Sequence, residues 1–249
     1  MSSSSGPSAP QPDASQPART NVDLRPLISS SLMDQGARPV CLPFALSHAH
    51  DALLDAQTGP GASTAMAPEA VWWHCTVHRQ TSLGGMLLED GALALRDSGQ
   101  PPLADWPWNP HLGVGTEDPP TAAGSPPWQQ VAAAELHLAH DGVEDPIEDA
   151  LAAGHPVVLI VEVTDEFDDA GPDGSIDVPD IRSPEGDYHA VLVVGAATHA
   201  ELGRRLLIRN SWGPYWGAGG YGWLPLDYLV ANALQAAVLI ALPPTDGAP

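Results

Sequence analysis

The sequence predicts an α+β protein with a mainly helical first half and a mainly β second half. Across residues 41–98, apolar and small side chains recur at helical spacing, and each such segment ends near Gly or Pro. From residue 157 onward, short runs rich in Val, Ile and Leu alternate with turn residues, which is typical of strands. We therefore expect a mainly helical part over about 22–127 and a mainly β part over about 128–249.

The N-terminal segment, residues 1–21, is rich in Ser, Pro and Ala and is expected to be a disordered tail. It lacks the basic start and the apolar core of a secretory signal. An extended entry segment should follow, and then a loop containing Gly and Pro, residues 34–40, which leads to Cys41.

Three helices are predicted in the first half. The first begins at Cys41 and ends at the Thr-Gly-Pro sequence of residues 58–60, and the others cover about 68–79 and 86–98. A stretch rich in Pro, Gly and Trp, residues 104–128, has no periodicity and predicts a long loop.

Four strands and one short helix are predicted in the second half. The strands cover residues 157–163, 189–196, 204–210 and 220–226, and the helix covers about 146–153. The acidic interval 164–187 between the first two strands is expected to be a solvated loop.

Composition excludes several classes of partner. The formal net charge of −22 would repel nucleic acid and anionic membranes, so neither is a predicted partner. No apolar run approaches the roughly 18 residues of a membrane-spanning helix. Because Cys41 and Cys75 are the two cysteines, a catalytic role for one would leave no intramolecular disulfide, which favours a reducing, cytoplasmic compartment.

Three residues form a candidate catalytic group. Cys41 lies at the start of a predicted helix, where unsatisfied N–H groups favour the thiolate and lower the pKa of a thiol. His189 begins one predicted strand and Asn210 ends the next, so adjacent strands can bring an imidazole and an amide within hydrogen-bond reach. Taken singly, these residues would be read as a small buried cysteine, a strand-end histidine and a turn asparagine.

Four sequence blocks in order resemble the papain family of cysteine peptidases. They are DQGARPVCLPFA, LGGMLLEDGALALRDSG, DYHAVLVVG and IRNSWGPYWGAGGYGWLPLDY. The resemblance covers roughly residues 22–240 and implies a two-lobe fold. In that fold a helical N-terminal lobe and a β-barrel-like C-terminal lobe enclose the active-site cleft.

The resemblance also implies roles for individual residues. Cys41 would be the nucleophile, His189 its base and Asn210 the residue that orients the base. The six-residue interval from Gln35 to Cys41 matches the family, so the Gln35 amide and the Cys41 N–H would form the oxyanion hole.

Two further features match the family pattern. Trp212 resembles the indole that shields the Asn–His hydrogen bond from water. Gly84 and Gly85 resemble the glycine pair that lets extended substrate backbone approach closely, and an ordinary turn before a helix is the alternative.

The sequence departs from the family around the nucleophile. Leu42 replaces a Trp, Pro39 and Val40 replace Gly and Ser, and the usual disulfide cysteines are absent. These changes point to a bacterial cytosolic branch. They leave two alternatives open, a catalytically degenerate binding module and a deamidase, transglutaminase-like or ubiquitin-like-processing enzyme.

The predicted partner is a protein or peptide substrate, and the acidic interval favours a basic one. No cofactor and no metal are predicted. His74, Cys75 and His78 on one predicted helix suggest zinc ligands, but exposed helical histidines explain them more simply, as they do His48 and His50. The acidic interval follows no recognised calcium-loop pattern.

Overall fold

The computed structural model describes residues 19–28, 30–59, 61–79, 85–179 and 186–242. The tail expected over residues 1–21 therefore lies outside the described residues, except for its last three. Gly84, one half of the candidate glycine pair, also lies outside them.

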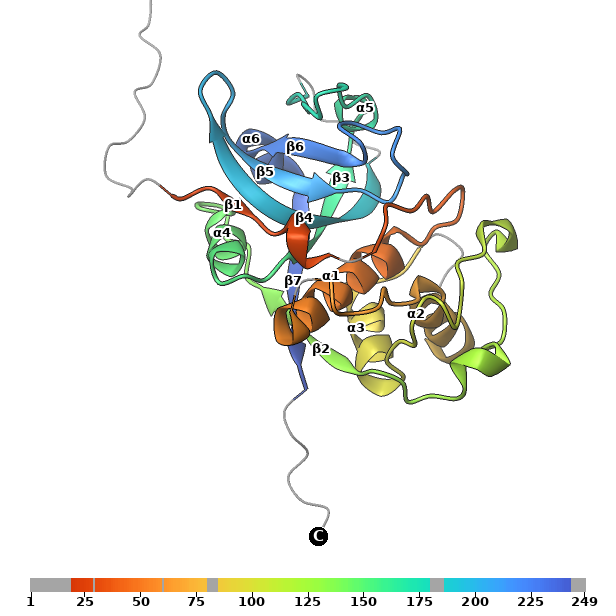
Figure 1. Cartoon of the computed structure of the whole chain (residues 1–249). Coiled ribbons are helices and arrows are strands. Elements are labelled where there is room, and N and C mark those ends of the chain that lie inside the picture. The colour runs from red at the N-terminus through yellow and green to blue at the C-terminus, as the bar shows by residue number, and fades with distance from the viewer. Residues whose placement is uncertain (1–18, 29, 60, 80–84, 180–185, 243–249) are drawn as a thin grey trace, which may run out of the picture.

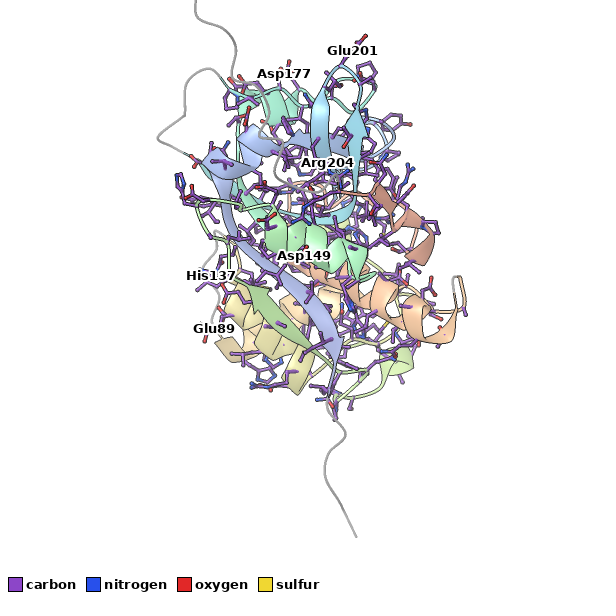
Figure 2. All side chains as sticks on the ribbon, turned by 90° about the vertical axis from the view of Figure 1, so that its left-hand side faces the viewer. Glu89, His137, Asp149, Asp177, Glu201 and Arg204 are labelled. Carbon is purple, nitrogen blue, oxygen red and sulfur yellow. The ribbon has the colours of Figure 1, made fainter. Side chains whose placement is uncertain are left out.

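Residues 19–21 contact the folded body. Arg19 forms ion pairs with Asp145 and Asp149, and the carbonyl of Thr20 accepts a hydrogen bond from Arg204. Figure 2 looks onto this face and labels Asp149 and Arg204. The described body thus begins a few residues before the expected boundary, because charged groups distant in sequence meet there.

The first half contains three α-helices, α1 (Cys41–Thr58), α2 (Pro68–His74) and α3 (Leu88–Asp97). A π-helical turn, η2 (Cys75–Arg79), continues α2, so the helix predicted over 68–79 is confirmed in two pieces. The short 3-10 turns are η1 (Arg25–Leu27), η3 (Pro110–Leu112) and η4 (Thr121–Ala123). The last two lie inside the predicted long loop of residues 104–128.

The described strands form one sheet in the order β2-β7-β3-β4-β5-β6, with antiparallel neighbours, and β1 pairs with β4. The strands are β1 (Val22–Asp23), β2 (Val131–Leu136), β3 (Val157–Val163), β4 (Asp187–His199), β5 (Gly203–Arg209), β6 (Tyr221–Pro225) and β7 (Ala233–Ala241). The α+β class is confirmed. The barrel-like closure is not, because β2 and β6 lie at opposite ends of the sheet order and do not pair.

Three further helices lie in the second half, α4 (Asp145–Ala152), α5 (Asp165–Asp168) and α6 (Leu226–Asn232). The short predicted helix corresponds to α4. The acidic interval contains α5, whose Phe167 is fully buried, so this part of the interval is not simply a solvated loop.

The sheet is buried on both faces. Along β3, Val157 and Leu159 point into one hydrophobic core, with side chains of α4 and α6, while Val158 points into another, with side chains of α1 and α3. Figure 1 shows α1 beside the sheet, and α3 packs against both α1 and the end strand β2. Burial on both faces explains why these strands read as continuous apolar runs.

One glycine is required by close packing of strands. A Cβ on Gly195 would lie 2.5 Å from the carbonyl oxygen of Val22, so β1 reaches β4 only because this position has no side chain. No helix in the described part of the chain is long and apolar enough to cross a membrane.

Candidate active site

The thiol of Cys41 reaches the sheet from the first turn of α1. Cys41 is the first residue of α1 and is partly buried, and its sulfur lies near the backbone N–H groups of Ala190 and Leu42, which lower the pKa of the thiol. Ala190 directly follows His189 in β4. The packing of α1 on β4 therefore brings the thiol to the part of the strand that carries the imidazole.

His189 and Asn210 are joined by a direct hydrogen bond. The distance from His189 Nε2 to Asn210 Oδ1 is 2.7 Å, and both side chains are buried. The same oxygen accepts the backbone N–H of Ser211 at 2.7 Å, which fixes the amide orientation. Because Oδ1 is an acceptor, Nε2 carries the proton, and Nδ1 is the ring nitrogen available to accept another.

Trp212 covers the imidazole. The two ring centroids lie 4.5 Å apart and the planes are tilted by 36°. Phe167 meets both rings edge-on, at 6.0 Å from His189 and 5.6 Å from Trp212. Phe167 was not predicted as a site residue, because it lies within the acidic interval. It is the single aromatic residue of that interval, which was the available signal.

Gln35 is bound to the same loop as Asn210. Its Oε1 accepts a hydrogen bond from Ser211 Oγ at 2.6 Å, and its backbone N–H donates to the Ser211 carbonyl at 2.8 Å. Its Nε2 donates to the carbonyl of Arg38 at 2.9 Å. An amide nitrogen has two hydrogens, and this bond uses one of them.

Burial opposes charge on both members of the candidate catalytic pair. Burial raises the pKa of the Cys41 thiol, while the backbone N–H groups of Ala190 and Leu42 lower it. Burial lowers the pKa of His189 to about 4, against the hydrogen bond to Asn210, which raises it. The expected lowering of the thiol pKa is therefore reversed, because desolvation outweighs the helix N-terminus.

Gly85 has a backbone conformation that favours glycine. Its φ is +137°, and a Cβ there would meet no atom within 4 Å. Both facts are compatible with close approach of an extended backbone. Gly84 lies outside the described residues.

The histidines considered for zinc have other surroundings. His48, His50 and His74 are buried, so the explanation by exposed helical histidines was wrong for them. His50 Nδ1 lies 2.9 Å from Gln100 Oε1, and His74 Nδ1 lies 2.6 Å from Ser98 Oγ. Among the described residues, no group of three or more His, Cys, Asp or Glu side chains is arranged to hold a metal ion.

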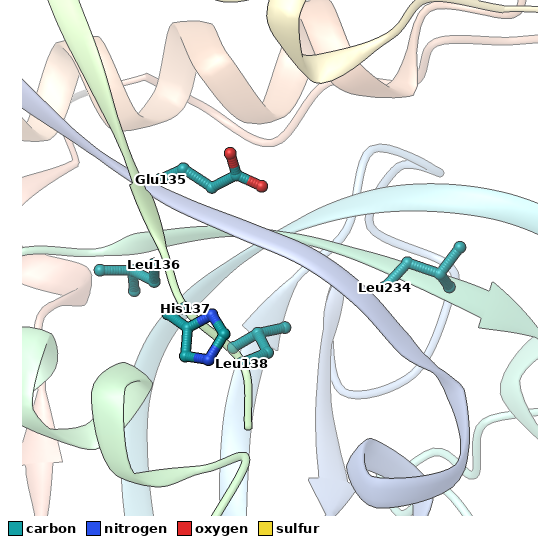
Figure 3. Close-up of a pocket in the computed structure, with 5 residues that line it drawn as sticks. All are labelled: Glu135, Leu136, His137, Leu138 and Leu234. Carbon is teal, nitrogen blue, oxygen red and sulfur yellow. The ribbon is translucent and has the colours of Figure 1, made fainter. Parts of the chain in front are cut away.

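A cavity of about 390 Å³ lies elsewhere, where β2 ends and β7 begins (Figure 3). Its lining residues are Glu135, Leu136, His137, Leu138 and Leu234. None of the predicted site residues contributes to it.

Solved structures with the same fold are cysteine proteases. Xylellain, a cysteine protease from Xylella fastidiosa, is 22% identical with a TM-score of 0.69, over 91% of this chain and 88% of that chain. Digestive procathepsin L 3 from the Tenebrio molitor larval midgut is 20% identical with a TM-score of 0.70, over 94% of this chain and 73% of that chain. The fold is thus that of the papain-like cysteine proteases.

Sequence comparisons agree with the fold. Residues 118–233 match the family model described as papain family cysteine protease. A probable cysteine protease RDL3 of Arabidopsis thaliana is 61% identical over 33 residues, which are 13% of this chain and 9% of that protein. An uncharacterized peptidase C1-like protein L477 of Acanthamoeba polyphaga mimivirus is 31% identical over 102 residues, 40% of this chain and 32% of that protein.

The chain therefore resembles the papain family of cysteine peptidases in both sequence and fold. It spans less than two thirds of the length of the two curated relatives.

Proposed function

We propose that the protein is a cysteine endopeptidase or amide hydrolase that acts through a thioester acyl-enzyme. The observation that carries the proposal is the buried 2.7 Å hydrogen bond between His189 and Asn210, beside the strand position that contacts the Cys41 thiol. This arrangement supplies a nucleophile, a base and a residue that orients the base.

In the proposed reaction, His189 Nδ1 accepts the thiol proton as the Cys41 sulfur attacks the carbonyl carbon of a peptide or amide. Burial disfavours charge on both the thiol and the imidazole, while the backbone N–H groups near the sulfur and the hydrogen bond to Asn210 favour it. Asn210 holds the Nε2 proton and so keeps Nδ1 as the basic atom.

The tetrahedral oxyanion would be stabilised by the Gln35 side-chain amide and the Cys41 backbone N–H. His189 then returns its proton to the leaving amine, and a thioester with Cys41 remains. Water deprotonated by the same imidazole hydrolyses that thioester and restores the thiol.

The proposed substrate is a protein or peptide, whose extended backbone would pass Gly85 and its neighbour Gly84. The proposed setting is the cytoplasm, as in a bacterial cytosolic member of the family. Cys41, one of the two cysteines, is a free thiol, which is compatible with a reducing compartment.

A graded pair of variants tests the proposal. Cys41→Ala removes the nucleophile and is expected to abolish cleavage of a peptide library while the circular dichroism spectrum stays unchanged. Asn210→Ala removes only orientation and is expected to leave a weaker enzyme. Undiminished hydrolysis by Cys41→Ala would refute the assignment.

The same experiment separates the alternatives. Mass spectrometry distinguishes a cut chain from a deamidated side chain and from a new cross-link. It therefore identifies which reaction the acyl-enzyme undergoes. A Cys41 thiol that ignores iodoacetamide at neutral pH, in a chain without cleavage activity, would indicate a degenerate binding module.

A further inference from the structure

Arg38 lies three residues before the proposed nucleophile and is almost completely buried. Its guanidinium binds the Glu69 carboxylate through both terminal nitrogens, at 2.6 and 3.1 Å. Its remaining bonds go to backbone carbonyls of Asn109, Gly113 and Gly115, at 2.8, 2.9 and 3.0 Å. All five N–H donors of the side chain therefore have an acceptor.

These bonds connect three segments that are distant in sequence. Arg38 belongs to the loop that carries Gln35, Glu69 lies in α2, and the three carbonyls belong to residues 109–115. The predicted long loop thus folds back onto the segment that precedes Cys41.

Trp108, which also lies in the predicted long loop, contacts the segment around Gln35 at two points. Its ring faces the Arg38 guanidinium at 4.2 Å, and its Nε1 donates to the Asp34 carbonyl at 3.1 Å. Asp34 and Arg38 flank Gln35, so both sides of Gln35 are attached to the same supporting segment.

The backbone of Arg38 contacts Gln35 directly. Its carbonyl accepts the Gln35 Nε2 hydrogen bond, and Ser211 holds Oε1 on the other side of the amide. The direction of the second Nε2 hydrogen is therefore determined by where the Arg38 backbone and the Ser211 hydroxyl lie.

We propose that Arg38 is a positioning residue for the oxyanion hole, and that its buried bonds to Glu69 and to residues 109–115 fix the direction in which Gln35 donates. This inference rests on the proposed function, because it requires that Gln35 binds the oxyanion. Lysine would not replace Arg38, since an ammonium has three donors and cannot bind a carboxylate as a planar fork.

A double-mutant cycle tests the inference. Gln35→Ala is expected to lower kcat by about a hundredfold, as the loss of one oxyanion donor does. Arg38→Met, which keeps the apolar stem, is expected to lower kcat by about tenfold to a hundredfold with KM little changed. Because both act on one donor, the double variant should lose no more than Gln35→Ala alone.

Two further measurements separate positioning from a general structural effect. Alkylation of Cys41 by iodoacetamide, followed by mass spectrometry, needs the thiol and imidazole but no oxyanion hole, so Arg38→Met should retain its rate. Arg205→Met is the matched control, since Arg205 is also buried and also binds backbone carbonyls, those of Ile176 and Trp223. It should leave kcat unchanged.

Losses that multiply in the double variant, or alkylation that falls together with kcat, would overturn the role of Arg38. A Gln35→Ala enzyme with full kcat would overturn the oxyanion assignment in the proposed function and the inference with it. If Arg38→Met does not fold, Glu69→Gln takes its place in the same double-mutant cycle. This substitution weakens the paired hydrogen bonds between Arg38 and residue 69 but keeps one acceptor oxygen.

Discussion

His189 is the residue whose surroundings bear most directly on the proposed chemistry. Its imidazole is buried, its Nε2 is bound to Asn210, and Trp212 and Phe167 cover it. A hydrogen bond between uncharged groups is stronger where water is excluded, so the aromatic cover also helps to hold the ring orientation.

Replacing the cover should change the titration of the imidazole. Trp212→Leu admits water, and because burial is the main cause that lowers the pKa of His189 to about 4, that pKa should rise toward the ordinary range of histidine. Nuclear magnetic resonance titration of the ring measures the change. Trp223→Leu is the control, since Trp223 packs on His199 at 4.5 Å and should leave His189 unaffected. An unchanged titration in Trp212→Leu would mean that other side chains exclude the water.

Sequence patterns indicated the residues that are proposed to react, but they did not indicate two residues that support them, Phe167 and Arg38. Cys41, His189 and Asn210 were singled out by the resemblance of four sequence blocks to the papain family, since each residue taken alone has an ordinary structural explanation. The contacts of Phe167 and Arg38 are made with side chains and carbonyls far along the chain, so no local pattern indicates them.

The helix α1 carries an unusual number of polar side chains into the interior. Asp51 accepts the Ser30 N–H at 2.7 Å, and Asp55 accepts the N–H groups of Gly61 and Ser63 at 2.9 and 2.7 Å. The helical spacing of α1 was predicted, but the burial of its polar residues was not. Their partners come from loops on either side of the helix, and the spacing of residues within the helix does not predict such partners.

Two histidines of α1 should make the protein sensitive to acid. Burial lowers the pKa of His50 to about 4 and that of His48 well below its ordinary value. As pH falls below 6.5, these histidines bind protons in the unfolded chain before they do so in the folded one. The contribution that they make to the free energy of unfolding above pH 6.5 is therefore lost toward pH 4. For His50 alone the loss amounts to about 3 kcal/mol.

Urea unfolding at a series of pH values measures this loss. His50→Gln keeps a donor for Gln100 and removes the titration, so its stability should fall less steeply below pH 6.5 than that of the unmodified chain. His111→Gln replaces an exposed histidine and should leave the slope unchanged. Parallel curves for His50→Gln and the unmodified chain would contradict the prediction.

Two strands and two helices of the second half, β2, β7, α5 and α6, were not predicted. The strands β2 and β7 are rich in Ala, which has little intrinsic preference for strands. They form because each residue from Val131 to Leu136 pairs with a residue of β7 about a hundred positions away. The helix α6 is short, and it follows β6 directly.

The whole molecule is strongly acidic, and part of that charge lies beside the proposed site. The helix α5 contains Asp165 and Asp168, and its Phe167 contacts His189. Burial and the neighbouring carboxylates of Asp165, Asp169 and Asp187 raise the pKa of Asp168, so these carboxylates lie close enough to repel one another. A basic substrate would be attracted to this region, and an acidic one would be repelled.

The attraction should be visible in the salt dependence of cleavage. For peptides with Arg near the cleaved bond, kcat/KM should fall as salt rises, because the screening length shortens from about 10 Å at 0.1 M to about 3 Å at 1 M. For matched acidic peptides it should rise. Neutralising exposed carboxylates near the site, with Asp165→Asn and Asp187→Asn, should reduce both trends.

The control for this prediction is Glu201→Gln, in the hairpin between β4 and β5, at the other end of β4 from His189 (Figure 2). It removes the same charge but should leave the salt dependence almost unchanged, because screening suppresses the effect of a distant exposed carboxylate. If all three substitutions had the same effect, the preference would come from net charge alone. If none had an effect and basic peptides were not favoured, the substrate would be selected by contacts other than these carboxylates.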